Sequence, residues 1–259
     1  MEKIIVFGNI SYSEIANLWL SYIDKLGLLK NVIFIALDNE IVENIKNYEV
    51  QTIKAPYDIK KKGLNGFWQF RCEIFLRILD KYGSFIHSDL DAIWLKNPEI
   101  ILKEINTDLI FSQGTIHPRP MFKKFGLVAC CGFFVIRDSD GARFFLNLLK
   151  SDVQNTGDDQ VSVNKILYNF VESFSFEDNY YEKVCFSNGE RFSIRCSNKN
   201  IFGDFKNFYD QKLSVAILPH RLFPRLKDSV DKSTIVAHPL APKSNDEKMK
   251  LLKEIRLLS

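Results

Sequence analysis

The most constraining feature of the sequence is a strand–helix–strand pattern in its first 37 residues. Two β-branched apolar runs, 4–7 and 32–37, are bounded by polar residues, as buried strands are. Between them, segment 13–25 carries the apolar stripe of a core-facing helix at spacings of three and four: Ile15, Leu18, Trp19, Tyr22 and Ile23. A β-α-β unit of this length predicts parallel strands joined by a right-handed crossover.

Strands and helices continue to alternate along the rest of the chain. The predicted strands are 84–87, 108–111, 128–136, 192–194, 214–218 and 234–237, and the predicted helices are 67–81, 142–150, 161–169 and 247–258. Two lysine-bearing segments, 54–66 and 117–124, are predicted to be basic loops. Because no repeat or linker interrupts the alternation, we expect one α/β domain over residues 1–259, with a mainly parallel central sheet flanked by helices.

Composition excludes several classes of protein. Hydrophobic residues make up 46% and charged residues 26% of the chain, which is a globular balance. The net charge of +3 and the pI of about 8.5 are too mild for a nucleic-acid binder, which usually has a pI above ~9. The longest apolar stretch, 127–136, is shorter than the ~20 residues that span a bilayer, and the N-terminus lacks the apolar run of a signal peptide. We expect a cytoplasmic protein with at most a peripheral contact at the inner face of a membrane.

The cysteines do not indicate a metal site or a disulfide framework. There are 5 of them, an odd number without a C-x-x-C or zinc-ligand spacing. We therefore predict free buried thiols at Cys72, Cys130, Cys131, Cys185 and Cys196.

An aspartate pair directly follows the predicted strand 84–87. Ligands of open parallel sheets gather beyond the carboxyl ends of the strands, which is where Asp89 and Asp91 lie. Residues i and i+2 of an extended chain point to the same side, so both carboxylates can face one cation. Two like charges beside the apolar run 93–95 are costly unless a hard divalent metal neutralises them. The pair indicates a site for Mn²⁺ or Mg²⁺, and a solvated turn is the alternative.

A second pair of the same spacing has a simpler interpretation. Asp138 and Asp140 precede Gly141 and a helical run, so we predict that their side chains cap that helix.

Among the four histidines, one has a suggestive position. His238 follows the predicted strand 234–237, potentially at the same sheet edge as the aspartate pair, whereas a structural role is the alternative. His87 lies within a strand and is predicted to be packed in the core. His117 and His220 have no evident partner in the sequence.

A third acidic motif opens the predicted helix 161–169. Asp158 and Asp159 suit the first turn of a helix because they interact favourably with its dipole. The functional alternative requires Asp159 or Gln160 to point at a substrate.

In this order, these motifs resemble the GT-A nucleotide-diphospho-sugar transferases, in particular their retaining branch of galactosyl-, xylosyl- and arabinosyltransferase-like enzymes. The resemblance covers nearly the whole chain. Its matching segments are 17–20 with 36–38, the Asp-x-Asp block of 83–98, the strand 132–137, Asp159 and Gln160 with Asn164, and a C-terminal block of 218–219, 223–224, His238 and Lys248. The resemblance implies a single GT-A (Rossmann-like) domain, with nucleotide binding over about 1–98 and sugar and acceptor binding over about 99–259.

The resemblance also implies roles for individual residues. The donor would be a nucleotide-sugar, in particular a UDP-sugar, and the acceptor a hydroxyl of a glycan or a lipid-linked glycan. The implied metal ligands for Mn²⁺ or Mg²⁺ are Asp89, Asp91 and His238. The implied catalytic residues beside the anomeric carbon are Asp159 and Gln160. The implied donor contacts are Asn9, Asp38, Trp68, Arg71, Asp89, Gly132, Lys248 and Lys243. One departure is that Cys130 and Cys131 precede Gly132, where relatives often carry a small polar residue.

The implied reaction is sugar transfer with retention of configuration. The metal and the lysines would neutralise the leaving diphosphate. Asp159 is the candidate nucleophile for a covalent route, and same-face attack, with Gln160 stabilising the cation, is the favoured one. Two other functions remain open: an Asp-x-Asp phosphohydrolase and a non-catalytic nucleotide-sugar-binding protein.

Overall fold

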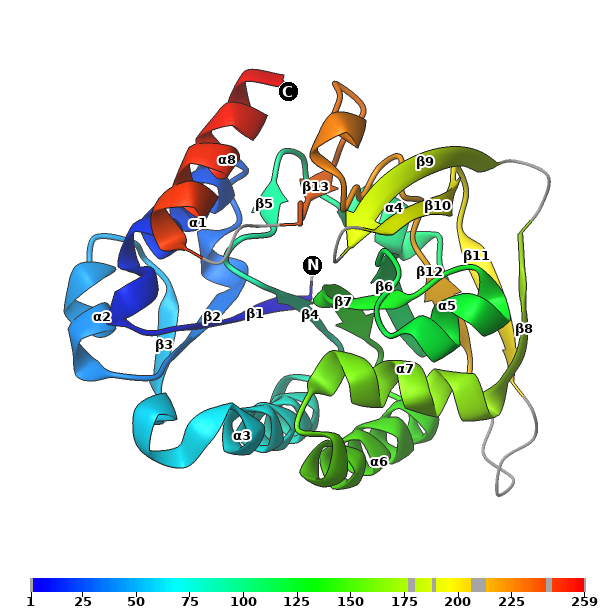
Figure 1. Cartoon of the computed structure of the whole chain (residues 1–259). Coiled ribbons are helices and arrows are strands. Elements are labelled where there is room, and N and C mark those ends of the chain that lie inside the picture. Colours follow the sequence, from blue (N-terminus) through cyan, green and yellow to red (C-terminus); the bar gives the residue numbers. More distant parts are fainter. Residues whose placement is uncertain (1, 177–179, 188–189, 206–212, 241–243, 259) are drawn as a thin grey trace.

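The computed structural model describes residues 2–176, 180–187, 190–205, 213–240 and 244–258. Its central feature is a nine-stranded sheet with helices on both faces (Figure 1). The helices are α1 (Ser13–Lys25), α2 (Asn39–Asn44), α3 (Ile59–Tyr82), α4 (Glu99–Lys103), α5 (Arg119–Phe125), α6 (Asp140–Thr156), α7 (Asp159–Phe170) and α8 (Asn245–Leu258). The strands are β1 (Lys3–Gly8), β2 (Val32–Ala36), β3 (Gln51–Lys54), β4 (Phe85–Ser88), β5 (Ile93–Trp94), β6 (Leu109–Gln113), β7 (Ala129–Ile136), β8 (Val171–Ser175), β9 (Tyr180–Ser187), β10 (Glu190–Ser197), β11 (Ile201–Phe205), β12 (Val215–Ile217) and β13 (Val236–Ala237).

The sheet has the order β3-β2-β1-β4-β7-β6-β12-β11-β8 and is mixed. Its N-terminal half is parallel, because β1 pairs in parallel with both β2 and β4, and β2 with β3. Strand β7 runs antiparallel to both of its neighbours, and so does β11. The predicted α/β class and the β-α-β unit at the N-terminus are confirmed, whereas parallel pairing dominates only the N-terminal half.

The alternation of side chains along the strands builds a separate apolar core on each face of the sheet. On β1, Ile4 and Val6 face one cluster, which α1 and α8 cover, while Ile5 faces a second cluster, which α3, α6 and α7 cover. Figure 1 shows α3, α6 and α7 together below the sheet and α8 beside α1 above it. The predicted closing helix therefore packs on the domain, with Leu252 and Ile255 fully buried.

Both predicted basic loops contain helix. Helix α3 begins at Ile59, earlier than predicted, and Gly63 (φ 73°, ψ 168°) introduces a kink in it. Helix α5 follows Pro118, and a proline at the start of a helix costs no hydrogen bond, so the prolines there were misleading loop signals. Lys124 donates from Nζ to the carbonyl of Val171 (3.1 Å), the residue that follows α7, so this lysine binds the C-terminal end of that helix.

The residue between the two aspartates of the second pair, and neither aspartate itself, caps α6. The side chain of Ser139, between the two acids, accepts the hydrogen bond from the backbone N–H of Ala142 (3.1 Å). Asp138 instead pairs with Arg143 (2.7 Å), and Asp140 lies in the first turn. The prediction that the two carboxylates cap the helix is therefore wrong, because the shorter hydroxyl side chain occupies the N-cap position.

Two further features agree with the sequence. All five cysteines are free and buried, as predicted. In the described part of the chain, no helix combines the length and the apolar character that a membrane span requires.

Candidate active site

The Asp-x-Asp turn follows β4 at the carboxyl edge of the parallel strands. The backbone N–H of Asp89 donates to the carbonyl of Gly132 on β7 (2.8 Å), and the N–H of Ala92 donates to the carbonyl of Asp89 (3.1 Å). These bonds fix the turn between two strands. Asp91 keeps only 9% of its surface exposed, and its carboxylate lies on the same side as that of Asp89, toward His238.

Two buried tryptophans support this turn from the face of the sheet that α1 covers. Trp94 donates from its indole N–H to the hydroxyl of Ser88 (3.0 Å), and Trp19 donates to the carbonyl of Ala92 (3.0 Å). The rings of Trp19 and Trp94 meet edge to face, with centroids 6.3 Å apart. The apolar residues after the aspartate pair thus support the position of the carboxylates.

His238 reaches the turn through the short antiparallel ribbon of β13 and β5. The register pairs Val236 with Trp94 and Ala237 with Ile93, so the next residue, His238, lies beside Asp91. His238 Nε2 is 3.2 Å from Asp91 Oδ1 and 3.9 Å from Asp89 Oδ2. The predicted proximity is therefore confirmed, although β13 pairs with β5 and lies outside the main sheet.

The three side chains fit a divalent cation. One ligand atom from each of Asp89, Asp91 and His238 lies within 4.8 Å of the others. Carboxylate oxygens suit hard cations such as Mg²⁺ and Mn²⁺, and an imidazole is a common ligand of transition metals. Space for the imidazole depends on Gly132, because a Cβ atom at that position would overlap His238 Cε1 and lie 2.8 Å from Asp89 Oδ2. A glycine at this position is therefore required by the site.

The protonation of Asp91 and His238 suits a site at which a bound cation displaces a proton. Burial raises the pKa of Asp91, but the hydrogen bond with His238 and the charge of Lys248 outweigh burial and hold this pKa below its usual range. Burial and Arg225 lower the pKa of His238, but Asp91 and Cys130 outweigh them and raise it to about 9. Because a metal ligand must be deprotonated, a cation would bind with release of the imidazolium proton.

Lys248 adds a positive charge on the other side of Asp91. It lies in the first turns of α8, and its Nζ is 3.0 Å from Asp91 Oδ2 and 3.3 Å from the hydroxyl of Tyr12. The side chain is thus held beside the turn, where it adds a positive charge. Lys243, the other lysine assigned to the donor, lies outside the described residues.

A cavity of about 260 Å³ opens beside the turn. Its lining residues are Phe7, Gly8, Asn9, Tyr12, Leu37, Leu64, Phe67, Trp68, Arg71, Asp89, Leu90, Asp91 and Lys248. Five predicted donor contacts therefore face one space: Asn9, Trp68, Arg71, Asp89 and Lys248. The aromatic members Tyr12, Phe7 and Phe67 could not be assigned from the sequence, because isolated aromatic residues there carry no distinguishing spacing.

Asp38 has a structural role next to this cavity. Its Oδ1 accepts from the N–H of Ile41 (2.9 Å) as the N-cap of α2, and its Oδ2 accepts from the N–H of Ile10 (2.9 Å). It does not line the cavity, so its contact with a donor stays a prediction.

Replacing Asp38 with alanine is expected to lower the free energy of unfolding by about 1–2 kcal/mol, because both backbone N–H groups lose their acceptor. Urea denaturation measures this change. Asp38→Asn keeps one cap acceptor and is expected to lose less. Equal stability of the alanine variant and the unmodified protein would contradict the capping role.

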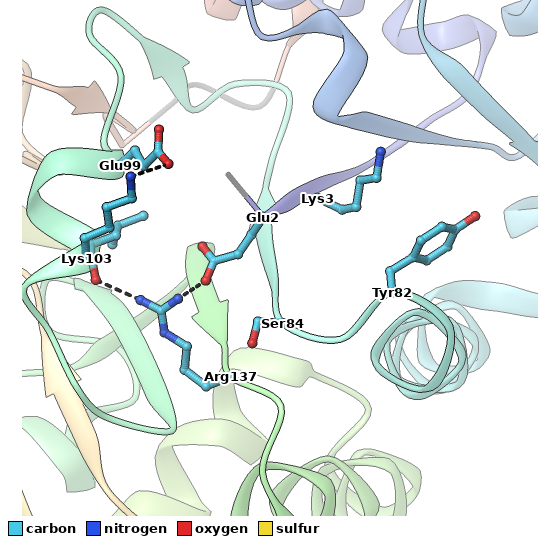
Figure 2. Close-up of a pocket in the computed structure, with 8 residues that line it drawn as sticks. Glu2, Lys3, Tyr82, Ser84, Glu99, Lys103 and Arg137 are labelled. Atoms are coloured by element: carbon cyan, nitrogen blue, oxygen red, sulfur yellow. Dashed lines mark hydrogen bonds and ion pairs between the residues drawn. The ribbon is translucent and has the colours of Figure 1, made fainter.

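A larger hollow of about 480 Å³ lies at the opposite edge of the sheet (Figure 2). Four of its five charged side chains pair with one another, and the fifth, Lys3, donates to the carbonyl of Lys30 (3.3 Å). Arg137 pairs with Glu2 and donates to the carbonyl of Leu102, and Lys103 pairs with Glu99 (2.9 Å). With these charges neutralised, the hollow offers no group that is poised for chemistry.

Arg71 connects the aspartate turn with the start of α7. Its guanidinium Nη2 is 3.0 Å from Asp159 Oδ2, and its Nη1 is 3.6 Å from Asp89 Oδ1. The side chain is 5% exposed, and the guanidinium lies over the ring of Trp68 at 5.0 Å. Burial lowers the pKa of Arg71, but Asp159 and Asp89 raise it above its ordinary value, so the group stays charged.

Asp159 and Gln160 point in different directions. Asp158 is the N-cap of α7 and accepts from the N–H of Val161 (2.8 Å), which leaves Asp159 free to face Arg71. Burial raises the pKa of Asp159 to about 6, against the opposing charge of Arg71. Gln160 accepts from the N–H of Cys131 (3.4 Å) and donates to the carbonyl of His117 (3.0 Å). Asp159 thus connects with the turn through Arg71, whereas the amide of Gln160 contacts backbone.

The family follows from a comparison with known proteins. A model of the nucleotide-diphospho-sugar transferase family matches residues 27–252. This chain belongs to that family. The transferase is therefore a glycosyltransferase, as the resemblance implied, and the phosphohydrolase interpretation loses its support.

The solved structures agree on the fold of the transferase. A crystal structure of the galactosyltransferase LgtC, in complex with donor and acceptor sugar analogs, matches with a TM-score of 0.57. The match covers 99% of this chain and 96% of that chain at 10% sequence identity, which shows a shared GT-A fold. No curated protein matches the sequence.

The structure of the transferase adds contacts that sequence reasoning missed. Cys130 Sγ lies 3.6 Å from His238 Nδ1, on the side of the ring away from the carboxylates. Asn164 accepts from the N–H of Ala129 (2.9 Å) and donates to its carbonyl (2.9 Å), which fixes α7 on β7. Asn164 was part of the motif that matched the family, but only the structure shows that it supports the position of Asp159.

Proposed function

We propose that this transferase moves a sugar from a UDP-sugar to a hydroxyl of a glycan or a lipid-linked glycan, with Mn²⁺ or Mg²⁺ as cofactor. The observation that carries the proposal is the convergence of Asp89, Asp91 and His238, with ligand atoms within 4.8 Å, at the wall of a cavity that predicted donor contacts line. The cation, when bound, supplies Lewis-acid neutralisation of the leaving diphosphate.

Side chains around the metal site bind the donor and neutralise its phosphates. Lys248 contributes a second positive charge toward the phosphates, because it is tied to Asp91 at 3.0 Å. Asn9 and Trp68 bind and orient the donor within the cavity. Asp38 and Lys243 are further donor contacts, and Gly132 keeps the space beside the metal ligands open.

Asp159 faces the sugar and stabilises positive charge near the anomeric carbon. Its pairing with Arg71 at 3.0 Å makes it a poor free nucleophile, which favours same-face attack over a covalent route. Gln160 stabilises the same positive charge through its amide carbonyl, which must first leave the backbone N–H of Cys131. Both routes retain the configuration of the donor.

The domain assignment belongs to the same proposal. Residues 1–259 form one domain, in which about 1–98 bind the nucleotide and about 99–259 bind the sugar and the acceptor. The protein acts in the cytoplasm in polysaccharide biosynthesis, with peripheral contact at the inner face of a membrane. Exposed apolar side chains near the cavity, Ile10 (42%) and Leu64 (56%), support an acceptor with a lipid portion.

A donor panel tests the proposed function. The purified protein is incubated with nucleotide-sugars, Mn²⁺ and a mixture of glycan acceptors, and mass spectrometry follows the product. We expect acceptor-dependent release of UDP that stops on chelation with EDTA and returns with Mn²⁺, because nothing else neutralises the diphosphate as strongly. The anomeric configuration of the product, read by NMR, tests retention.

Several outcomes contradict the proposal. Hydrolysis of phosphate esters without release of a nucleoside diphosphate would overturn the transfer reaction. Transfer that continues in EDTA would overturn the metal dependence. A calorimetric titration without Mn²⁺-assisted binding of UDP would overturn the donor class.

A further inference from the structure

A buried histidine lies beneath the aspartate turn, where the sequence predicted only packing. His87 is on β4 and is 1% exposed. Its Nδ1 is 3.0 Å from the carbonyl oxygen of Ile5 on β1, and its Nε2 is 3.1 Å from Arg71 Nη2 and 3.2 Å from Asp89 Oδ1. Both ring nitrogens therefore have partners, and two of these partners, Arg71 and Asp89, belong to the candidate active site.

The partners determine the protonation of the ring. A carbonyl oxygen only accepts hydrogen bonds, so Nδ1 must carry the proton toward Ile5. At Nε2 the two partners require opposite states, because the guanidinium of Arg71 only donates and the carboxylate of Asp89 only accepts. Arg71 is the nearer of the two, and a ring that is 1% exposed beside a permanent positive charge is favoured in its neutral form, so Nε2 accepts from Arg71. The imidazole is then neutral, and Asp89 receives its positive partner from Arg71, whose Nη1 is 3.6 Å away.

Arg71 has few other contacts that set its direction. Three aromatic rings surround the guanidinium at 5.0–5.8 Å, those of Trp68, Phe75 and Phe7, and such faces hold a cation without fixing its rotation. Its Nε has no hydrogen-bond partner among the described residues. Directional contacts remain at Nη1 and Nη2 alone, where Nη2 also donates a long hydrogen bond to the carbonyl of Cys131 (3.5 Å).

We propose that His87 is a positioning residue for Arg71: the ring, anchored to β1 through Ile5, accepts from Nη2 and thereby aims the guanidinium into the gap between Asp89 and Asp159. This inference rests on the proposed function. Without the acceptor at Nε2, Nη2 keeps only Asp159 and the long contact with the carbonyl of Cys131, so the guanidinium can shift within its aromatic slot. Asp159 then loses its fixed partner, and the geometry around the reacting sugar is disturbed even though the metal ligands remain.

Two substitutions separate positioning from packing. His87→Phe keeps an aromatic ring and removes the acceptor, and we expect kcat to fall by about 100-fold, the usual effect of a small misplacement, with a smaller change in KM for the donor. His87→Gln keeps one donor and one acceptor, so we expect it to recover to within about 10-fold of the unmodified kcat.

A matched control addresses the aromatic cluster. Phe85, two residues earlier on β4, contacts the same rings of Phe75 and Phe134 as His87 does, but has no contact with Arg71. Phe85→Leu is expected to lower the melting temperature at least as much as His87→Phe, with kcat within about 3-fold of the unmodified protein.

A second readout does not require activity. In the free protein with ¹⁵N-labelled arginine, the guanidinium resonances of Arg71 are expected to be resolved in the unmodified protein and in His87→Gln, and averaged by rotation in His87→Phe. Unchanged resonances and kcat in His87→Phe would overturn the positioning role, as would a His87→Gln variant that is folded but as slow as His87→Phe. An unmodified protein with resolved Arg71 resonances and no transfer activity would overturn the proposed function and retain the role of His87 toward Arg71.

Discussion

Replacing Asp91 with asparagine is expected to lower metal-dependent sugar transfer by about 1,000-fold, the size of effect seen when one strong electrostatic group is removed from an active site. The substitution keeps the shape of the side chain but removes the charge that faces both His238 (3.2 Å) and Lys248 (3.0 Å). A cation then loses one of two carboxylate ligands, and Lys248 loses its anchor. Transfer assays and calorimetric titration with Mn²⁺ measure the two losses.

The chain contains its own control for this substitution. Asp140 belongs to the second Asp-x-Asp pair, and it lies exposed in the first turn of α6. Asp140→Asn removes the same charge away from the site and is expected to change stability by less than about 1 kcal/mol through the helix dipole, with transfer unchanged. Full activity of Asp91→Asn would count against the proposed metal site and in favour of a function that does not use it.

Replacing Gly132 with alanine is expected to lower the affinity for the metal by about 100-fold, although no ligand is altered. The added Cβ would overlap the imidazole of His238 and approach Asp89 Oδ2 to 2.8 Å. Because the ribbon of β13 and β5 holds His238 from behind, the ring can leave only by breaking its contact with the carboxylates. Calorimetry with Mn²⁺, with and without UDP, measures the loss.

This substitution also costs stability, so its control must do the same elsewhere. Overpacking at Gly132 is expected to cost about 1–3 kcal/mol. Gly27 has a positive φ (68°) in open space, and Gly27→Ala is expected to cost about 1–2 kcal/mol through backbone strain alone, with Mn²⁺ affinity unchanged. If Gly132→Ala bound Mn²⁺ like the unmodified protein, the imidazole would not lie over that glycine and the proposed ligand set would be wrong.

The local elements could be predicted because each depends on neighbouring residues. The stripe through 13–25 predicted α1 within its observed bounds, and the apolar runs predicted β1, β2 and β7 to within one or two residues. Predictions failed where local signals were ambiguous. Pro118 and Pro120 indicated a loop, although they lie at the start of α5. Asp138 and Asp140 were predicted as the capping residues, although Ser139 between them is the N-cap.

The candidate site could be predicted in part. Asp89 and Asp91 are related by strand geometry, and His238 was suggested by its place after an apolar run. Asp159 was found through its motif, but its connection with the turn was not, because that connection passes through Arg71 on α3. Cys130 stood out only as a departure from the family pattern, and His87 only as a packed residue of a strand.

What the sequence determined by itself is the set of elements and the presence of two carboxylates on one side of a strand end, because periodicity and spacing act over a few bonds. The tertiary structure decided which distant groups meet there. The pairing of β13 with β5 brings a residue from position 238 beside position 91, and the close approach of β7 makes a glycine necessary at 132. Such contacts depend on strand register and on packing between layers. Register and packing are set by the burial of the whole apolar core rather than by any short stretch of chain.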